Sequence, residues 1–152
     1  MNAIKAILNN EFDVLIHPCN CSNVMATGIN KDVKDNFPEN ELEDFKLWKK
    51  YRKNPNFMIG NFTYKIYSKN ERKFAIINAY INHEPYSPAP YQNYTAAIRK
   101  AVKKFGNTKR YLICNSDRLL IKEELLLEKI ERLSFELEVQ LKLITHDSKT
   151  ET

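Results

Sequence analysis

The stretch HPCNCSNVMATGIN, residues 17–30, joins a short apolar run to a helical pattern. The apolar run at 12–16 is rich in β-branched and aromatic residues, which is typical of a buried strand. Downstream, Ile29, Val33 and Phe37 recur at helical spacing until a proline ends the pattern. A strand that leads through a Gly-containing turn into a helix directs backbone N–H groups and the positive end of the helix dipole at one spot. The stretch therefore predicts an anion-binding loop.

Length and composition indicate one globular domain. The chain has 152 residues, of which 43% are hydrophobic and 28% are charged, and no apolar run is long enough to span a bilayer. We expect a single domain at 1–146 and a polar tail at 147–152. The amino terminus lacks the layout of a signal peptide, and the three cysteines are an odd number. We therefore expect a cytoplasmic protein with free thiols.

The formal net charge of +5 favours an anionic partner. The main basic clusters, at 49–53 and 99–104, fall on predicted helices, where a solvated outer face explains them. Nucleic-acid footprints usually show denser basic runs or interleaved stacking aromatics. A nucleic-acid partner is therefore the least favoured alternative, and an anionic small ligand is favoured.

Strand-like and helix-like segments alternate along the chain. We expect strands at 3–8, 12–17, 61–67, 74–81, 111–114 and 138–145, and helices at 26–36, 41–52, 93–105 and 119–133. The strands at 61–67 and 74–81 are separated by a turn that suggests a hairpin. The alternation predicts an α/β domain with helices on both faces of a sheet. The loops after His17, Ile81 and Cys114 would then share the rim where ligand clefts form.

Two predicted helices carry apolar residues on one face, the side that normally faces a core. In the helix at 41–52 this face holds Leu42, Phe45 and Trp48, and Asn40 fits an N-cap. In the helix at 93–105 the predicted buried stripe consists of Tyr94, Ala97, Ile98, Ala101 and Val102.

Several of these segments resemble the macrodomains, which bind ADP-ribose and related metabolites. The likeness is to the compact branch with ADP-ribose 1″-phosphate phosphatases and ADP-ribosyl-glutamate hydrolases, where a strand ends in H-G-C-N-C followed by M-G-S-G-I-A. Here residues 17–21 read H-P-C-N-C, 25–30 read M-A-T-G-I-N, and F-P stands at 37–38. Residues 76–80, I-I-N-A-Y, and 91–99 resemble a strand and a helix of the same branch. The resemblance implies a three-layer α/β/α macrodomain-like fold with a mixed central sheet.

The resemblance also implies which residues bind ligand. Asn20 matches the asparagine that contacts the distal ribose, and Gly28 lies in the loop that wraps the diphosphate, where backbone N–H groups approach closely. An adenine-binding aspartate is expected after the first strand, where Asn9, Asn10 and Glu11 stand instead. Two alternatives stay open: Glu11 or Asn10 serves weakly, or adenine is held mainly by backbone and stacking. The full implied ligand set is Asn20, Asn23, Val24, Met25, Ala26, Thr27, Gly28, Ile29, Asn78, Tyr80, Asn115, Ser116 and Arg118.

Three residues form the implied catalytic set. His17 matches a histidine of the phosphatase-like branch, and an imidazole can move a proton or orient water. The family's second glycine-rich loop is replaced here by N-S-D-R-L-L-I-K-E-E at 115–124. Asp117 or Glu123 could replace the acidic residue after that loop, and Arg118 could contact phosphate through two N–H groups. Surface or capping roles stay open for all three, and Asp117 fits an N-cap of the next helix.

The cysteines of the loop do not suggest a metal site. His17, Cys19 and Cys21 lack an evident fourth ligand, and structural zinc prefers paired C-x-x-C-like knuckles. A nucleophilic Cys19 would need a base and an oxyanion site that the sequence does not identify. We expect no metal and no cofactor, with Cys19 and Cys21 packed under the loop.

Two functional classes follow from the resemblance. One is hydrolysis at the distal ribose, as an ADP-ribose 1″-phosphate phosphatase or ADP-ribosyl hydrolase, with His17 and a carboxylate sharing the proton transfers. The other is a non-catalytic module that sequesters an ADP-ribose-type nucleotide, which the missing second glycine-rich loop favours. The expected partner is an ADP-ribose-type small molecule or an ADP-ribosylated protein. We expect a monomer that binds neither membrane nor nucleic acid.

Overall fold

The fold is built on a five-stranded mixed sheet. The structure is a computed structural model that describes residues 1–148, so most of the predicted polar tail lies outside the described residues. The strands are β1 Val14–Asn20, β2 Phe62–Lys69, β3 Arg72–Asn82, β4 Arg110–Cys114 and β5 Gln140–Ile144, arranged in the order β2-β3-β1-β4-β5. β1 runs parallel to β3 and β4, β5 runs parallel to β4, and β2 is antiparallel to β3. The predicted α/β class with a mixed sheet is confirmed.

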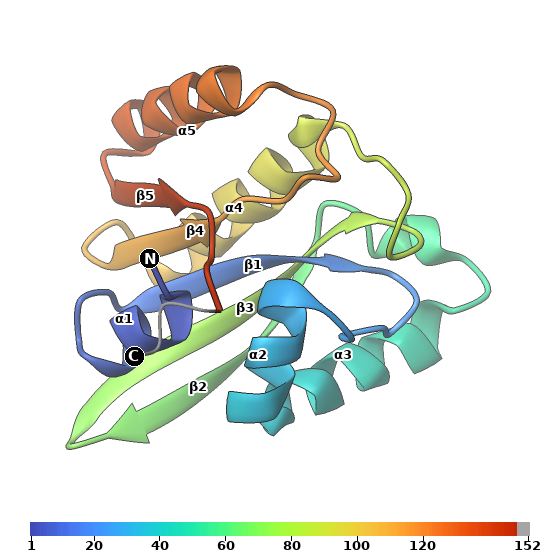
Figure 1. Cartoon of the computed structure of the whole chain (residues 1–152), viewed down its shortest axis with the longest axis horizontal. Coiled ribbons are helices and arrows are strands. Elements are labelled where there is room, and N and C mark those ends of the chain that lie inside the picture. The colour runs from blue at the N-terminus through green and yellow to red at the C-terminus, as the bar shows by residue number, and fades with distance from the viewer. Residues whose placement is uncertain (149–152) are drawn as a thin grey trace.

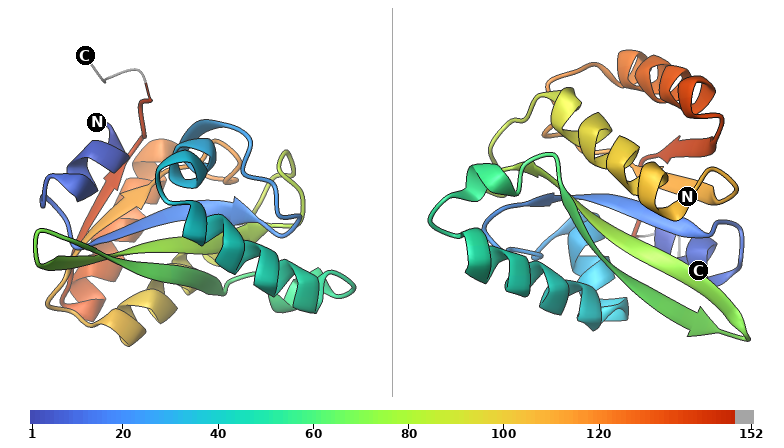
Figure 2. Two further views of the ribbon diagram at one scale, coloured as in Figure 1. Left: turned by 90° about the horizontal axis from the view of Figure 1, so that it is seen from below. Right: turned by 180° about the vertical axis from the view of Figure 1, so that it is seen from behind.

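Helices cover both faces of the sheet, as two opposite views show (Figures 1 and 2). α4 Tyr91–Phe105 and α5 Glu123–Leu137 lie on one face, while α1 Ala3–Leu8, α2 Gly28–Asn36 and α3 Pro38–Tyr51 lie on the other. A short 3-10 helix, η1 Pro55–Phe57, follows α3. This is the three-layer α/β/α arrangement that the resemblance implies.

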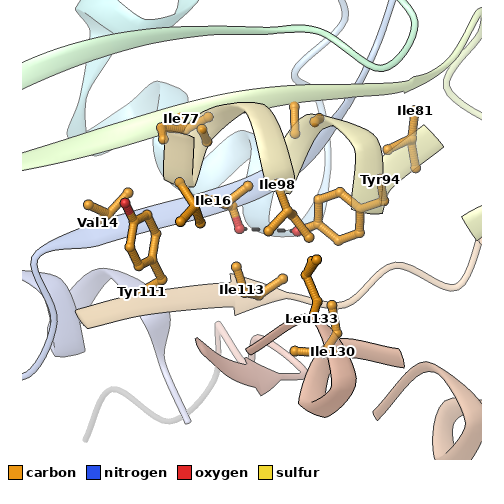
Figure 3. Packing of buried hydrophobic residues seen from close by; sticks show 14 of the residues in the cluster. Val14, Ile16, Ile77, Ile81, Tyr94, Ile98, Tyr111, Ile113, Ile130 and Leu133 are labelled. Atoms are coloured by element: carbon orange, nitrogen blue, oxygen red, sulfur yellow. Dashed lines mark hydrogen bonds between the residues drawn. The ribbon is translucent and has the colours of Figure 1, made fainter. Parts of the chain in front are cut away.

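The larger core lies between the sheet and the helices α4 and α5. Side chains of β1 alternate between the two faces, and Ile16 points to this core. Ile98 packs beside it, and the Tyr94 hydroxyl donates to the main-chain oxygen of Ile16 over 3.2 Å (Figure 3). The predicted stripe on α4 is confirmed, because all five of its residues are buried.

Two smaller cores lie on the opposite face. One joins Leu15 of β1 to α1 and α2. The other holds Cys19 and Cys21 together with Met58 and Tyr80. We expected both cysteines to pack under the loop that follows β1. They pack instead beneath α3 and the segment after η1.

Residues 3–8 form the helix α1, so the prediction of a strand there is wrong. The buried positions are Ala3, Ile4, Ala6 and Ile7, which is the spacing of a helical face and not the alternation of a strand. The Asn2 side chain caps this helix by accepting from the Lys5 N–H over 3.0 Å.

The helix α3 presents a polar face to the sheet. It begins at Pro38, so Asn40 is not its N-cap, and Asn40 and Asp44 are its buried residues. Leu42 and Phe45 are exposed. The predicted apolar face is therefore wrong for Leu42 and Phe45, whereas Trp48 is half-buried against the core that holds Cys19 and Cys21. The buried residues of α3 supply hydrogen-bonding groups to the strands.

The segment before α5 has its own structure. α5 begins at Glu123 with Lys122 at the N-cap position, so Asp117 does not cap it. The main-chain oxygen of Arg118 instead accepts from Ala89, over 2.9 Å, and Leu120 donates to the oxygen of Ala89 over 2.8 Å. These bonds tie the segment to the proline-rich loop that follows β3.

The hairpin of β2 and β3 is confirmed. Its turn residues, Asn70 and Glu71, both have positive φ, which is the backbone of a two-residue turn that suits the twist of paired strands. No helix within residues 1–148 is both long enough and apolar enough to cross a membrane.

Candidate functional site

A cleft of about 410 Å³ opens at the carboxyl ends of the parallel strands. Its walls are the start of α2 at 27–30, the proline-rich loop at 85–86, the loop at 115–118 and the chain after β5 at 145–146, with Pro18 of β1 among them. The loops after β1, β3 and β4 therefore meet at one rim, as the sequence predicts. Ligands of open α/β sheets bind at this edge.

The amino end of α2 faces this cleft without a side-chain cap. Thr27 is the N-cap residue and makes no side-chain capping bond, although the first-turn N–H groups of a helix need partners. Gly28 has φ +57°, and a Cβ there would meet open space. Glycine is therefore favoured at this position by the backbone conformation and not by crowding. The end of the helix is available to an anion.

Asn20 shapes the loop that precedes α2. Its side chain is buried, its Oδ1 accepts from the N–H groups of Ser22 (2.9 Å) and Val24 (3.3 Å), and its Nδ2 donates to the Val24 oxygen (2.8 Å). Asn23 adopts φ +57°, and its Oδ1 is buried without a partner within the described chain. The loop is thus held by an internal amide, which fixes where α2 begins.

The loop after β4 brings a cation to the opposite wall. The Arg118 guanidinium lies over the Tyr86 ring, 5.2 Å from its centre, and 3.6 Å from Asp117 Oδ1. The Asp117 side chain is 89% exposed. Asn115 Oδ1 accepts from the Ser116 N–H over 2.7 Å. This wall therefore offers side chains where the related pattern has a glycine-rich loop, as the sequence at 115–118 predicts.

His17 lies behind the cleft and not in it. Its exposed fraction is 0%. Its Nδ1 is 2.8 Å from Asn30 Oδ1, and its Nε2 is 2.6 Å from Asn78 Oδ1. Burial lowers the pKa of His17 below its usual value, so the neutral ring is favoured. The link from His17 to the cleft runs through Asn30.

Asn78 connects His17 to a buried polar network. Its Nδ2 donates to the Asn40 main-chain oxygen and to Thr63 Oγ1, each over 3.0 Å. Thr63 Oγ1 lies 2.8 Å from the Tyr80 hydroxyl, and that hydroxyl donates to Asp44 Oδ1 over 2.8 Å. The network accounts for the polar face of α3.

The structure gathers some of the implied residues and separates others. Those that line the cleft are Thr27, Gly28, Ile29, Asn115, Ser116, Asp117 and Arg118. Those that do not are His17, Asn20, Asn23, Val24, Met25, Ala26, Asn78, Tyr80 and Glu123. Asn10 pairs with Arg110 at the amino end of β4, over 2.9 Å, on the edge of the sheet away from the cleft. Asn10 therefore lies at the opposite end of the strands from the cleft, where it cannot take the adenine-binding role considered for it.

The predicted site left out six of the residues that line the cleft, which are Pro18, Asn30, Pro85, Tyr86, Thr145 and His146. Asn30 stood inside the stretch that predicts the loop, where the related pattern has alanine. Tyr86 lies in the proline-rich loop, whose path no local pattern fixes. His146 follows the last strand, and its Nδ1 accepts from the Ala3 N–H over 3.0 Å while its Nε2 lies 2.7 Å from Asp32 Oδ2. No signal near His146 in the sequence indicates these distant partners.

The thiols of the loop are poor candidates for metal ligands. Burial raises the pKa of Cys21 to about 12 and raises that of Cys19 as well. Protonated thiols bind metals weakly because the thiolate is the ligand. Within residues 1–148 no cluster of three or more His, Cys, Asp or Glu side chains is arranged to hold a metal ion.

Comparisons with known proteins rest on structure. No family model matches the sequence, and a search of curated proteins finds no match. The macrodomain of Mycobacterium tuberculosis DarG aligns with a TM-score of 0.71 and 16% identity, covering 93% of each chain. Thermosipho africanus DarTG in complex with ADP-ribose aligns with a TM-score of 0.66 and 13% identity, over 94% of this chain and 40% of that one. A macrodomain protein from Streptomyces coelicolor aligns with a TM-score of 0.64 and 14% identity, covering 88% of each chain.

Proposed function

We propose that this chain, which has the macrodomain fold, binds ADP-ribose or an ADP-ribose derivative in the cleft between residues 27–30 and 115–118. Part of the Thermosipho africanus protein that was solved in complex with ADP-ribose, 40% of its chain, shares this fold, which supports this choice of ligand. The ligand is either the free nucleotide or the same group attached to a protein.

The observation that carries the proposal is the uncapped start of α2. Residues 27–30 at this helix start line the cleft, and Gly28 supplies the positive-φ backbone there. A diphosphate supplies the negative charge that such a helix end stabilises. The cleft volume also falls within the roughly 300–1,000 Å³ of small-molecule sites.

The opposite wall suits the same ligand. Arg118 offers charge-assisted donors to phosphate oxygens. The exposed ring of Tyr86 offers a flat surface on which a ring of the ligand can stack. Within this proposal Thr27, Gly28, Ile29, Asn115, Ser116 and Arg118 contact the ligand. Asn20, Asn23, Val24, Met25, Ala26, Asn78 and Tyr80 act behind them by holding the loop and the strand ends.

A non-catalytic binding module is the form of this function that the geometry supports best. Hydrolysis at the distal ribose would need a placed acid or base. Asp117 lines the cleft but is nearly fully exposed, Glu123 lies outside it, and His17 is buried with both ring nitrogens occupied. Hydrolysis is therefore the second candidate function, and it depends on Asp117 as its one acid or base in the cleft.

Calorimetry with ADP-ribose tests the binding function. We expect saturable binding by the wild-type protein. The variant Arg118→Ala should weaken it about 10- to 100-fold, the loss expected for a hydrogen bond to a charged group. Arg132→Ala removes the same charge from the exposed surface of α5 and should leave the affinity unchanged. No binding by the wild type, or an equal effect of both variants, would contradict the proposal.

A release assay separates binding from hydrolysis. ADP-ribose 1″-phosphate and an ADP-ribosylated protein are incubated with the wild type and with Asp117→Asn. The binding module predicts no release by either protein. Release by the wild type that Asp117→Asn abolishes would instead establish the hydrolase.

A further inference from the structure

We propose that His17 is a positioning residue, which orients the side-chain amide of Asn30 so that its oxygen accepts a hydrogen bond from a hydroxyl of the bound sugar. The inference rests on the proposed ADP-ribose function. It adds a specificity residue, Asn30, and a reason why a buried histidine stands beneath it.

The orientation of the Asn78 amide is fixed by its surroundings. Its Nδ2 lies 3.0 Å from the main-chain oxygen of Asn40, which can only accept, so this end of the amide must be the NH₂ group. Its Oδ1 accepts from Asn40 Nδ2 over 3.2 Å, and that Nδ2 also donates to the main-chain oxygen of Ile76 over 2.9 Å. The atom of Asn78 that faces His17 is therefore an oxygen.

This orientation determines the tautomer of His17. An oxygen 2.6 Å from Nε2 requires a proton on Nε2. The other neighbours of the ring are Asn30, the Cys19 thiol at 3.6 Å and 3.7 Å, and the more distant His146, whose charge would oppose a second proton. Burial also favours the neutral form. Nδ1 then carries a lone pair and must accept.

The tautomer in turn orients Asn30. An amide next to an accepting Nδ1 must present its NH₂ end, and a half turn about the last side-chain bond exchanges nitrogen and oxygen at little geometric cost. The 2.8 Å contact is compatible with either end of the amide. With NH₂ on His17, the amide oxygen of Asn30 is the end left for the cleft. Within residues 1–148 the Asn30 amide has no hydrogen bond besides the one to His17.

The result is a site with two chemically different neighbours. The first-turn N–H groups of α2 donate hydrogen bonds and suit phosphate oxygens. The Asn30 oxygen accepts, so it repels a phosphate oxygen and suits a hydroxyl. Side by side, they fit a phosphate joined to a sugar better than a phosphate alone.

Nitrogen NMR of the His17 ring tests the tautomer directly. In uniformly ¹⁵N-labelled wild-type protein at pH 7, we expect a protonated Nε2 and an unprotonated Nδ1. The measurement needs no ligand, so it is independent of the proposed function. A protonated Nδ1, in either a neutral or a charged ring, would overturn the inference.

Binding measurements test what Asn30 recognises. Asn30→Ala should weaken ADP-ribose about tenfold and leave the affinity for inorganic pyrophosphate, which has no sugar, unchanged. Asn36→Ala is the matched control, because Asn36 is exposed on the same helix, and it should change neither affinity. Equal losses of both ligands in Asn30→Ala would overturn the inference.

A double-variant cycle tests whether His17 acts through Asn30. His17→Gln should weaken ADP-ribose in the wild-type background but not in Asn30→Ala. If His17→Gln does not fold, the NMR result and the Asn30→Ala comparison still decide. Failure of the wild type to bind ADP-ribose would overturn the proposed function together with this ligand assignment. ADP-ribose binding that Asn30→Ala does not change would overturn the inference alone.

Discussion

Two buried ionisable side chains, His17 and Asp44, belong to one hydrogen-bonded network between the sheet and the helices α2 and α3. Asn78, Thr63 and Tyr80 connect them. Burial lowers the pKa of His17 and raises the pKa of Asp44 to about 6, so in both cases the neutral form is favoured. Hydrogen bonds within the network offset part of the cost of burying these groups, and that cost rises when Asp44 ionises above about pH 6.

Asp44→Asn should change how stability depends on pH. The folded-state pKa of Asp44, about 6, lies above its unfolded value of 3.8. The protonated carboxyl therefore contributes fully to the stability of the fold below pH 3.8, and this stability is lost as pH rises through 6. Asparagine keeps an oxygen for the Tyr80 hydroxyl and never ionises. We expect Asp44→Asn to exceed the wild type by about 1–3 kcal/mol in unfolding free energy at pH 8 and to match it near pH 4.

Urea unfolding at the two pH values measures this difference. Asp35→Asn is the control, because Asp35 is exposed on α2 and pairs with Lys31 at the surface. It should change the unfolding free energy by less than about 1 kcal/mol at both pH values. An Asp44→Asn protein that is less stable than the wild type at pH 8 would show that the buried carboxylate stabilises the fold.

Gly28→Ala should weaken ligand binding and lower stability by about 1–2 kcal/mol. An alanine at φ +57° is strained by about 1–2 kcal/mol, although its Cβ would meet no neighbour. Relief of that strain would move the first N–H groups of α2, so we expect weaker ADP-ribose binding by calorimetry. Gly106→Ala carries similar strain, at φ +99° and outside the cleft, and should lower stability without changing affinity. Equal affinities of the two variants would contradict this role of Gly28.

The helices α3 and α4 illustrate two ways of packing on one sheet. α4 buries an apolar stripe, as its periodicity predicts. α3 buries Asn40 and Asp44 and exposes Leu42 and Phe45. The difference arises because β3 presents Asn78 and Tyr80 toward α3, and these polar atoms need partners.

Ile98→Ala should destabilise the fold strongly, because Ile98 is fully buried between α4 and the sheet. We expect a loss of about 2–5 kcal/mol in unfolding free energy, measured by urea denaturation. Phe135→Ala removes a larger side chain that is 86% exposed on α5, and it should cost less than about 0.5 kcal/mol. Similar losses in both variants would contradict the placement of the core.

The cleft joins parts of the chain that are far apart in sequence. Parallel strands β1, β3, β4 and β5 end at one edge, so the loops that follow them meet there. His146 connects this edge to the start of the chain and to α2 through Ala3 and Asp32. The cleft wall and the packing of α1 therefore depend on one another.

His146→Ala should loosen this junction. It removes an acceptor from the Ala3 N–H and a partner from Asp32, so we expect a loss of about 1–3 kcal/mol in unfolding free energy. His83→Ala is the control, because the His83 side chain is exposed and its one hydrogen bond within residues 1–148 is the surface contact with Asn56. It should cost less than about 1 kcal/mol. Hydrogen exchange at the amides of α1 should rise in His146→Ala alone.

Much of the fold could be predicted because its signals are local. The loop at 17–30, the hairpin turn at 70–71 and the stripe of α4 depend on residues a few positions apart, where spacing and turn chemistry act directly. The segment at 3–8 was too short for its period to be recognised. The polar face of α3 could not be predicted, because its partners lie on a strand more than thirty residues away.

The order of the strands and α-helices from β1 onward, the Gly-containing turn before α2 and the burial of β1 follow from the chain alone, since periodicity and backbone preference operate between near neighbours. Only the tertiary structure decided that His17 is covered while Asn30, Arg118 and His146 share one cleft. The physical reason is that such proximity depends on the order of strands in the sheet and on the crossovers between them. No interaction between sequence neighbours encodes that order.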